Sequence, residues 1–79
     1  MEYTYTVIYQ LTEEGGTSAY VPALGVNTQG GSLEEARSMA KDLIQDQVET
    51  FVKTGKVVPQ ETERYEGEKV SVKVTVTVT

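Results

Sequence analysis

Apolar and polar residues alternate along two segments of the chain, one near each end. Over residues 3–11, aromatic and aliphatic side chains take the odd positions, and threonines take two of the four even ones. Over residues 69–79, valine takes every even position from Val70 to Val78. A period of two with β-branched and aromatic residues predicts strands that have one buried and one solvated face.

Turn residues divide the region after the first strand into two shorter strands. Residues 13–16, Glu-Glu-Gly-Gly, break the first strand, since glycine permits the positive φ of a tight hairpin. A return strand over residues 17–21 ends at Pro22, which has no N–H to donate to a ladder. A third strand follows over residues 26–29. These segments predict an antiparallel meander.

The period changes from two to that of a helix after Gly31. Ser32 and Glu35 have the spacing of a capping box, and Gly55 suits the position just past a helix end. Apolar residues recur between them at steps of three and four, which is typical of a helix with one buried side. The helix is expected from about Leu33 to Thr54. Its apolar stripe consists of Leu33, Ala36, Ala40, Leu43, Ile44, Val48, Phe51 and Val52.

The order of these elements predicts the fold class. Residues 59–67 are polar and acidic and are expected to form a loop. The order β-β-β-α-β then indicates an α+β domain, in which one long helix covers one face of a four-stranded sheet in two layers. A helix between the third and fourth strands favours a parallel relation between them through a right-handed crossover. The last strand can then lie beside the first, which gives the spatial order 3-2-1-4.

Two further expectations follow from this arrangement. Residues 1–79 form a single domain, because the length supports one domain and no repeat is visible. The threonine-rich face of the sheet, opposite the helix, is expected to be open to water.

Composition removes several classes of chemistry. The 79 residues include no cysteine and no histidine, which excludes thiolate or imidazole zinc ligands, a cysteine nucleophile and a histidine base. Asp42, Asp46 and Glu49 have the spacing of a solvated helix face, and the strands offer no interior carboxylate for two-metal nuclease chemistry. We therefore expect no catalytic, cofactor-binding or metal-binding residues.

The net charge of the chain indicates which classes of partner are favoured and which are disfavoured. The net charge of −5 argues against a surface that follows nucleic-acid phosphates or an anionic membrane, and it suits a basic protein partner. The first residues do not form a signal peptide, and no apolar stretch is long enough for a membrane span. We expect a cytoplasmic protein.

Taken together, these segments resemble the HicB-like antitoxin family over essentially the whole chain. The resemblance is carried by a Tyr-rich opening strand, by residues 20–26, Tyr-Val-Pro-Ala-Leu-Gly-Val, and by residues 28–36, Thr-Gln-Gly-Gly-Ser-Leu-Glu-Glu-Ala. A helix with Ala36 and Ala40, then Gly55, Pro59 and a Val-rich strand follow. The resemblance implies a partial ribonuclease H-like fold. It also implies a non-enzymatic, commonly oligomeric antitoxin that neutralises a small basic mRNA-cleaving toxin, HicA, by direct binding.

The sequence departs from the family pattern at three places. Fuller members continue into a helix-turn-helix or ribbon-helix-helix segment that binds the operator, whereas this sequence ends at Thr79, so we expect no direct DNA binding by it. Ala23 and Gly25 stand where the family often has an acidic residue and a Pro-Gly pair. Gly31 stands where an acidic residue commonly precedes the helix cap.

Three hypotheses of function remain open. The first is a HicB-like antitoxin domain that binds and masks a HicA-type toxin. The second is an orphan oligomeric binding module that has no toxin partner. The third is a degenerate ribonuclease H-like nuclease, which the missing strand carboxylates disfavour.

The last strand is the predicted partner or self interface. In the order 3-2-1-4 it lies at an edge of the sheet. Lys69 and Lys73 are the only charged side chains of this strand that would disfavour its pairing with another strand. We expect it to pair with a partner or with its own copy, which would give a homodimer or a higher oligomer. The alternative is that the loop over residues 59–67 covers this edge. The residues expected at the interface are Val70, Val72, Lys73, Val74 and Val76.

Overall fold

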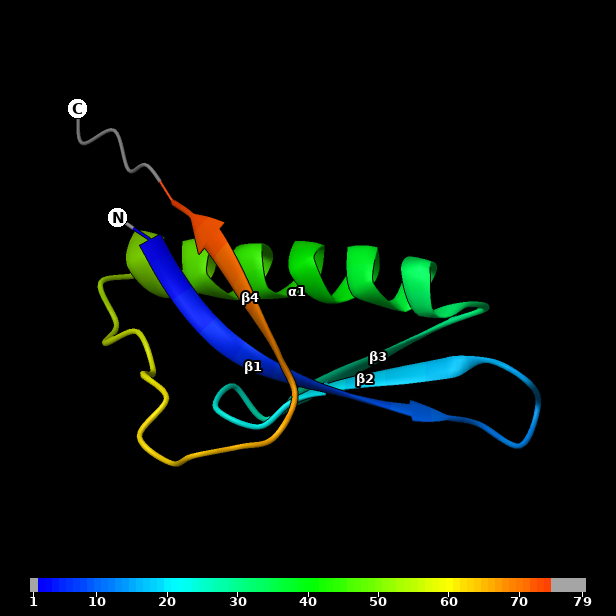
Figure 1. The fold of residues 1–79 in the computed structure, drawn as a ribbon. Helices are drawn as coiled ribbons and strands as arrows, with labels where there is room; N and C mark the ends of the chain where they lie inside the picture. The colour runs from blue at the N-terminus through cyan, green and yellow to red at the C-terminus, as the bar shows by residue number, and fades with distance from the viewer. Residues whose placement is uncertain (1, 75–79) are drawn as a thin grey trace.

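The computed structural model describes residues 2–74 and contains five elements in the predicted order (Figure 1). They are β1 (Glu2–Leu11), β2 (Thr17–Val21), β3 (Val26–Gly30), α1 (Leu33–Lys53) and β4 (Glu68–Lys73). The bounds of the first four agree with the prediction to within one residue. The last strand begins one residue early and ends at Lys73, and the predicted strand positions 75–79 lie outside the described residues.

The four strands form one sheet in the order β3-β2-β1-β4, as predicted. Every neighbouring pair is antiparallel, including β1 and β4, in which Glu2 lies opposite Lys73 and Tyr5 lies opposite Val70. Because β3 runs parallel to β1, β4 also runs antiparallel to β3. The predicted parallel relation between the third and fourth strands is therefore wrong.

The connection between α1 and β4 explains this direction. A short loop after α1 would start the next strand at the end of the sheet where the helix ends, which gives the parallel crossover. Instead, residues 54–67 run back beneath β1 before β4 begins near its middle (Figure 1). The connection thus runs back along about half of β1, and β4 then runs from Val7 toward Glu2 of that strand.

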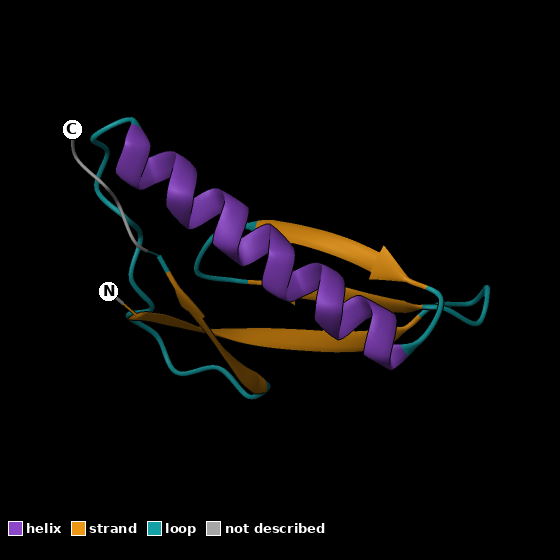
Figure 2. Cartoon of the chain, turned by 90° about the horizontal axis from the view of Figure 1, so that it is seen from above, coloured by secondary structure: helices purple, strands orange, loops and turns teal. Residues whose placement is uncertain are grey.

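The helix lies across one face of the sheet, and the core fills the space between the two layers (Figure 2). Small side chains on α1, Ala36 and Ala40, are fully buried and let the helix approach the strands closely. At the end of β3, a side chain on Gly30 would place its Cβ 2.6 Å from the Ala36 nitrogen, so only glycine fits. The buried apolar residues are Tyr5, Val7, Ala19, Val21, Ala36, Ala40, Ile44, Val48, Val70, Val72 and Val74.

Both ends of the helix are capped by the residues that the sequence indicates. The Ser32 hydroxyl accepts a hydrogen bond from the Glu35 N–H at 3.1 Å, and the Glu35 carboxylate accepts one from the Gly31 N–H at 2.9 Å. The reciprocal bond of the capping box therefore goes one residue further back than the cap itself. At the other end Gly55 has φ of 71°, and Gly55 and Lys56 donate to carbonyls of the last turn, which completes a Schellman motif.

A substitution at Ile44 tests the packing of the helix against the sheet, because this side chain is fully buried near the middle of α1. We expect Ile44→Ala to lower the free energy of unfolding by about 2–5 kcal/mol, a large fraction of the total for a domain this small. Met39→Ala on the same helix, where the side chain is 38% exposed, should cost under about 1 kcal/mol. Urea denaturation measures both, and equal small losses would contradict the packing described.

Candidate interaction site

Strand β1 is twice as long as its neighbour β2, which leaves half of one edge without a strand. β1 has ten residues and β2 has five. β2 pairs with residues 8–11 and stops before Pro22. Residues 2–7 have β4 on one side, but among the described strands none pairs with them on the other side. Their backbone N–H and C=O groups on that side require other partners.

The connection from α1 to β4 fills part of this vacant edge. One oxygen of the Glu61 carboxylate accepts the Thr6 backbone N–H at 2.7 Å, and the other accepts the Thr6 hydroxyl at 2.9 Å. The Tyr5 hydroxyl donates to the Pro59 carbonyl at 2.6 Å. Because Tyr5 and Thr6 are consecutive in a strand, their side chains lie on opposite faces of the sheet. The two side chains therefore contact the connection between α1 and β4 from opposite faces. We call these contacts, together with Lys69, the β1 clasp.

The clasp corrects one expectation from the sequence. The face of the sheet opposite the helix was expected to be open to water along its threonines, yet Thr6 is fully buried. Glu61, in a segment that the sequence marks only as loop, and Lys69 of β4 contact its hydroxyl. Further along the same face Thr4 remains exposed and shares a 2.7 Å hydrogen bond with the Ser71 hydroxyl.

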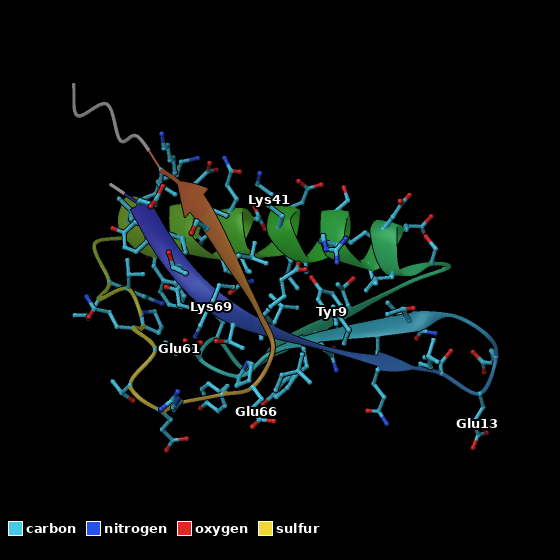
Figure 3. The ribbon with its side chains drawn as sticks, viewed as in Figure 1. Tyr9, Glu13, Lys41, Glu61, Glu66 and Lys69 are labelled. Carbon is cyan, nitrogen blue, oxygen red and sulfur yellow. The ribbon has the colours of Figure 1, made fainter. Side chains whose placement is uncertain are left out.

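Lys69 adds a charge to the clasp from the neighbouring strand. It lies directly opposite Thr6 in the pairing of β1 with β4. Its ammonium donates to the Thr6 hydroxyl at 2.5 Å and to the Glu61 carboxylate at 2.9 Å. Glu61 and Lys69 lie on the same side of the ribbon, beneath β1 (Figure 3). The ammonium is therefore drawn across the sheet toward β1 and away from the outer edge of β4.

The clasp changes the acidity of two of its groups. Partial burial alone would raise the pKa of the Glu61 carboxyl, but hydrogen bonds from Lys69 and Thr6 outweigh it and hold this pKa below its usual value. Burial raises the pKa of the Tyr5 phenol, so its hydroxyl stays protonated and able to donate. Both groups are thus in the ionisation states that the clasp needs at neutral pH.

A second polar cluster joins the helix to the sheet on the other face. The Arg37 Nε donates to both oxygens of the Glu68 carboxylate at 2.8 and 3.0 Å, and the Tyr9 hydroxyl donates to the first of them at 3.0 Å. The Arg37 guanidinium also lies 5.9 Å from the centre of the Tyr9 ring. The hydrogen bond from Arg37 lowers the pKa of Glu68. Because the ion pair is substantially exposed to water, we expect it to stabilise the fold only slightly.

The residues predicted at a partner or self interface divide into two groups. Val70, Val72 and Val74 are at most 8% exposed and belong to the core beneath the helix. Lys73 is exposed and lies opposite Glu2, and Val76 is outside the described residues. β4 is at the end of the strand order, so its backbone edge, rather than its valine side chains, is the surface it can offer a partner. Pairing at this edge stays a prediction.

Acidic side chains gather at the end of the molecule that carries the β1–β2 hairpin. Arg37 is the first basic residue of the chain, so every charged side chain before it is a glutamate. Glu13 and Glu14 are exposed at the hairpin, and Glu34 and Glu35 are exposed at the start of the helix. Glu14 and Glu35 line one hollow, which brings the two pairs together, and Glu13 projects from the ribbon at this end (Figure 3). We call these four residues the acidic end.

The described part of the chain contains no group of three or more acidic side chains arranged to hold a metal ion. Asp42 and Asp46, on the polar face of the helix, are exposed as expected. Within residues 2–74, no helix is long and apolar enough to cross a membrane.

Comparison with known proteins identifies the fold. No family model and no curated protein matches the sequence. The crystal structure of the N-terminal domain of the Burkholderia pseudomallei antitoxin HicB matches with a TM-score of 0.68 and 18% sequence identity. The match covers 96% of this chain and 100% of that domain. This chain has the fold of the HicB N-terminal domain: four antiparallel strands in the order 3-2-1-4 with one long helix.

Glu61→Gln tests the clasp, because it keeps the shape of the side chain and removes its charge. We expect it to lower the free energy of unfolding by about 1.5–3 kcal/mol, the range for hydrogen bonds to a charged group. Glu66→Gln, at an exposed position of the same connection, is the matched control and should change it by less than about 0.5 kcal/mol. Denaturant unfolding at pH 7 measures both variants.

The same pair of variants predicts a pH dependence. The lowered pKa of Glu61 stabilises the folded state above the ordinary glutamate value of 4.5, and this contribution is lost as the pH falls through the lowered pKa. The difference in stability between wild type and Glu61→Gln should therefore shrink below about pH 4.5. A difference that stays constant down to acid pH would show that the Glu61 charge has no part in the clasp.

Proposed function

We propose that this chain is a non-enzymatic, HicB-like antitoxin domain of the cytoplasm that binds and masks a small basic mRNA-cleaving toxin of the HicA type. The observation that carries the proposal is the match to the HicB N-terminal domain over the full length of that domain. The sequence resemblance to HicB-like antitoxins, which rests on motifs in the strands, the helix cap and the helix, supports it independently of the backbone.

The charge of the chain supports a basic partner. The net charge is −5, and Arg37, the first basic residue after the glutamates of the acidic end, is paired with Glu68. A basic protein would be attracted to such a surface, which raises the rate of encounter and orients it. Masking requires only that the antitoxin covers the toxin's active surface. The proposed mechanism therefore asks for no catalytic group on this chain.

Reconstitution with a toxin tests the proposal. It requires the same genome, most simply the neighbouring reading frame, to encode a short basic protein that cleaves mRNA. Addition of an equimolar amount of this chain should abolish cleavage by that protein. Unimpaired cleavage, together with no binding by calorimetry, would leave the orphan module as the function. Turnover of RNA by this chain alone with Mg²⁺ or Mn²⁺ would overturn the non-enzymatic assignment.

Charge substitutions test whether the acidic end is the surface to which the toxin is attracted. We expect Glu13→Gln, Glu14→Gln and Glu34→Gln, combined in one variant, to slow association with the toxin about tenfold at low salt, and this difference should vanish at high salt. A matched variant combines Asp42→Asn, Asp46→Asn and Glu66→Gln and removes the same charge from other exposed positions. Stopped-flow association measures both, and equal slowing would show that the toxin responds to net charge and not to the acidic end.

A further inference from the structure

Strand β1 has a second stretch of unpaired edge, at its hairpin end and on the side of β4. β4 pairs with residues 2–7 and begins opposite Val7. Residues 8–11 pair with β2 on one side, and none of the described strands pairs with them on the other side. The contacts of the β1 clasp are at Tyr5 and Thr6, on earlier residues of β1. The hairpin end of β1 therefore has an edge that no described strand uses.

The direction of the backbone groups at this edge follows from the hydrogen bonds on either side of it. The N–H and C=O groups of successive strand residues alternate between the two sides of the strand. The Thr6 N–H is bonded to Glu61, away from β4, and the Thr12 N–H is bonded across the hairpin, toward β2. The odd-numbered residues Tyr9 and Leu11 therefore direct their backbone groups to the vacant side. We call the N–H and C=O groups of these two residues the β1 hairpin edge.

Two exposed leucines lie beside the β1 hairpin edge. Leu11 is 80% exposed and lies on the helix face of β1, two residues after Tyr9. Leu33 is 44% exposed and lies one helical turn before Arg37, on the same side of α1. Tyr9 and Arg37 both donate to the Glu68 carboxylate, so strand and helix meet there. Both leucines follow this contact toward the hairpin end, where α1 begins, and leave apolar surface that a partner can cover (Figure 1).

The acidic end borders the same edge and indicates the charge of its occupant. Glu13 follows Leu11 by two residues, and Glu34 follows Leu33 directly, and both glutamates are exposed. A segment along this edge that carries lysine or arginine would be attracted to these carboxylates. A second copy of the chain would instead bring its own glutamates to the same place, where like charges repel. The outer edge of β4 carries two lysines, which disfavour a basic segment there.

We propose that the toxin adds an extended segment to β1 at the β1 hairpin edge, beyond the start of β4. The backbone groups of Tyr9 and Leu11 pair with the backbone of this segment. An apolar side chain of the segment packs against Leu11 and Leu33, and a lysine or arginine further along lies near Glu13 and Glu34. The inference rests on the proposed function, because it names the surface and the binding mode for the same basic partner.

Amide hydrogen exchange with and without the toxin tests the edge directly, and the probe is the basic protein of the neighbouring reading frame. We expect the toxin to slow exchange of the Tyr9 and Leu11 amides at least about tenfold. The Ser71 amide is the control, because the same alternation turns it to the outer edge of β4, and its rate should not change. Unchanged Tyr9 and Leu11 amides in a complex that forms, or slowing of the Ser71 amide instead, would overturn the inference. Slow exchange at Tyr9 and Leu11 that depends on the concentration of the free chain would place a second copy there and would also overturn it.

A proline at the edge tests the backbone pairing. Leu11→Pro removes an outward N–H, and Leu11→Ala is the matched control, because it loses the same side chain and keeps the N–H. Both variants should fold, since Leu11 is exposed at the end of β1. We expect calorimetry to show that Leu11→Pro binds the toxin about tenfold more weakly than Leu11→Ala. Ser71→Pro, at the outer edge of β4, should bind the toxin as wild type does.

The same titrations separate this inference from the proposed function. A wild-type chain that binds and inhibits the toxin, with equal affinities for Leu11→Pro and Leu11→Ala, would overturn the docking edge alone. Weaker binding of Ser71→Pro, with Leu11→Pro unaffected, would place the toxin on β4 and would also overturn only the docking edge. A wild-type chain that neither binds nor inhibits the toxin would overturn the proposed function and this inference together.

Discussion

The hydrogen bonds of the Glu61 carboxylate to Thr6 and Lys69 are the constraint on which the rest of the sheet depends. β2 is too short to cover β1, so the vacant edge has backbone groups to satisfy. A carboxylate from the connection takes the place of the missing strand, and the Tyr5 hydroxyl holds the same segment from the core side. With the connection fixed there, the chain runs back to the middle of β1 before β4 begins opposite Val7, and β4 is antiparallel to β1.

The sequence was sufficient for most of the architecture and insufficient for this clasp, for a physical reason. Strands, helix and caps depend on residues close together in the chain, such as Ser32 and Glu35, and their spacing can be read directly. The clasp joins Thr6 to Glu61, two residues that no local period connects. The parallel direction expected for β4 rested on a short crossover, which the connection does not follow. One signal was present: a first strand of nine predicted residues beside a second of five implies a half-vacant edge.

Charged side chains are distributed unevenly over the described residues. Glutamates gather where the hairpin meets the start of the helix, a surface suited to a basic protein. Of the two lysines of β4, Lys69 is paired with Glu61, and Lys73 lies opposite Glu2 in the strand register. Sequence reasoning proposed an interface on the valines of β4, but the helix buries those side chains. An interface on β4 stays a prediction. The available surface is the backbone edge, and it became visible only with the strand register.

The most direct test of the clasp is an NMR pH titration that follows the backbone amide of Thr6. This amide has no strand partner on its side, and its protection from exchange must come from the Glu61 carboxylate. We expect slow hydrogen exchange of the Thr6 amide at neutral pH. We also expect a large shift of the Thr6 amide proton with a midpoint below the ordinary glutamate pKa of 4.5, and loss of both features in Glu61→Gln. A Thr6 amide that exchanges freely, or whose shift does not follow Glu61, would show that this carboxylate does not hold the edge of β1.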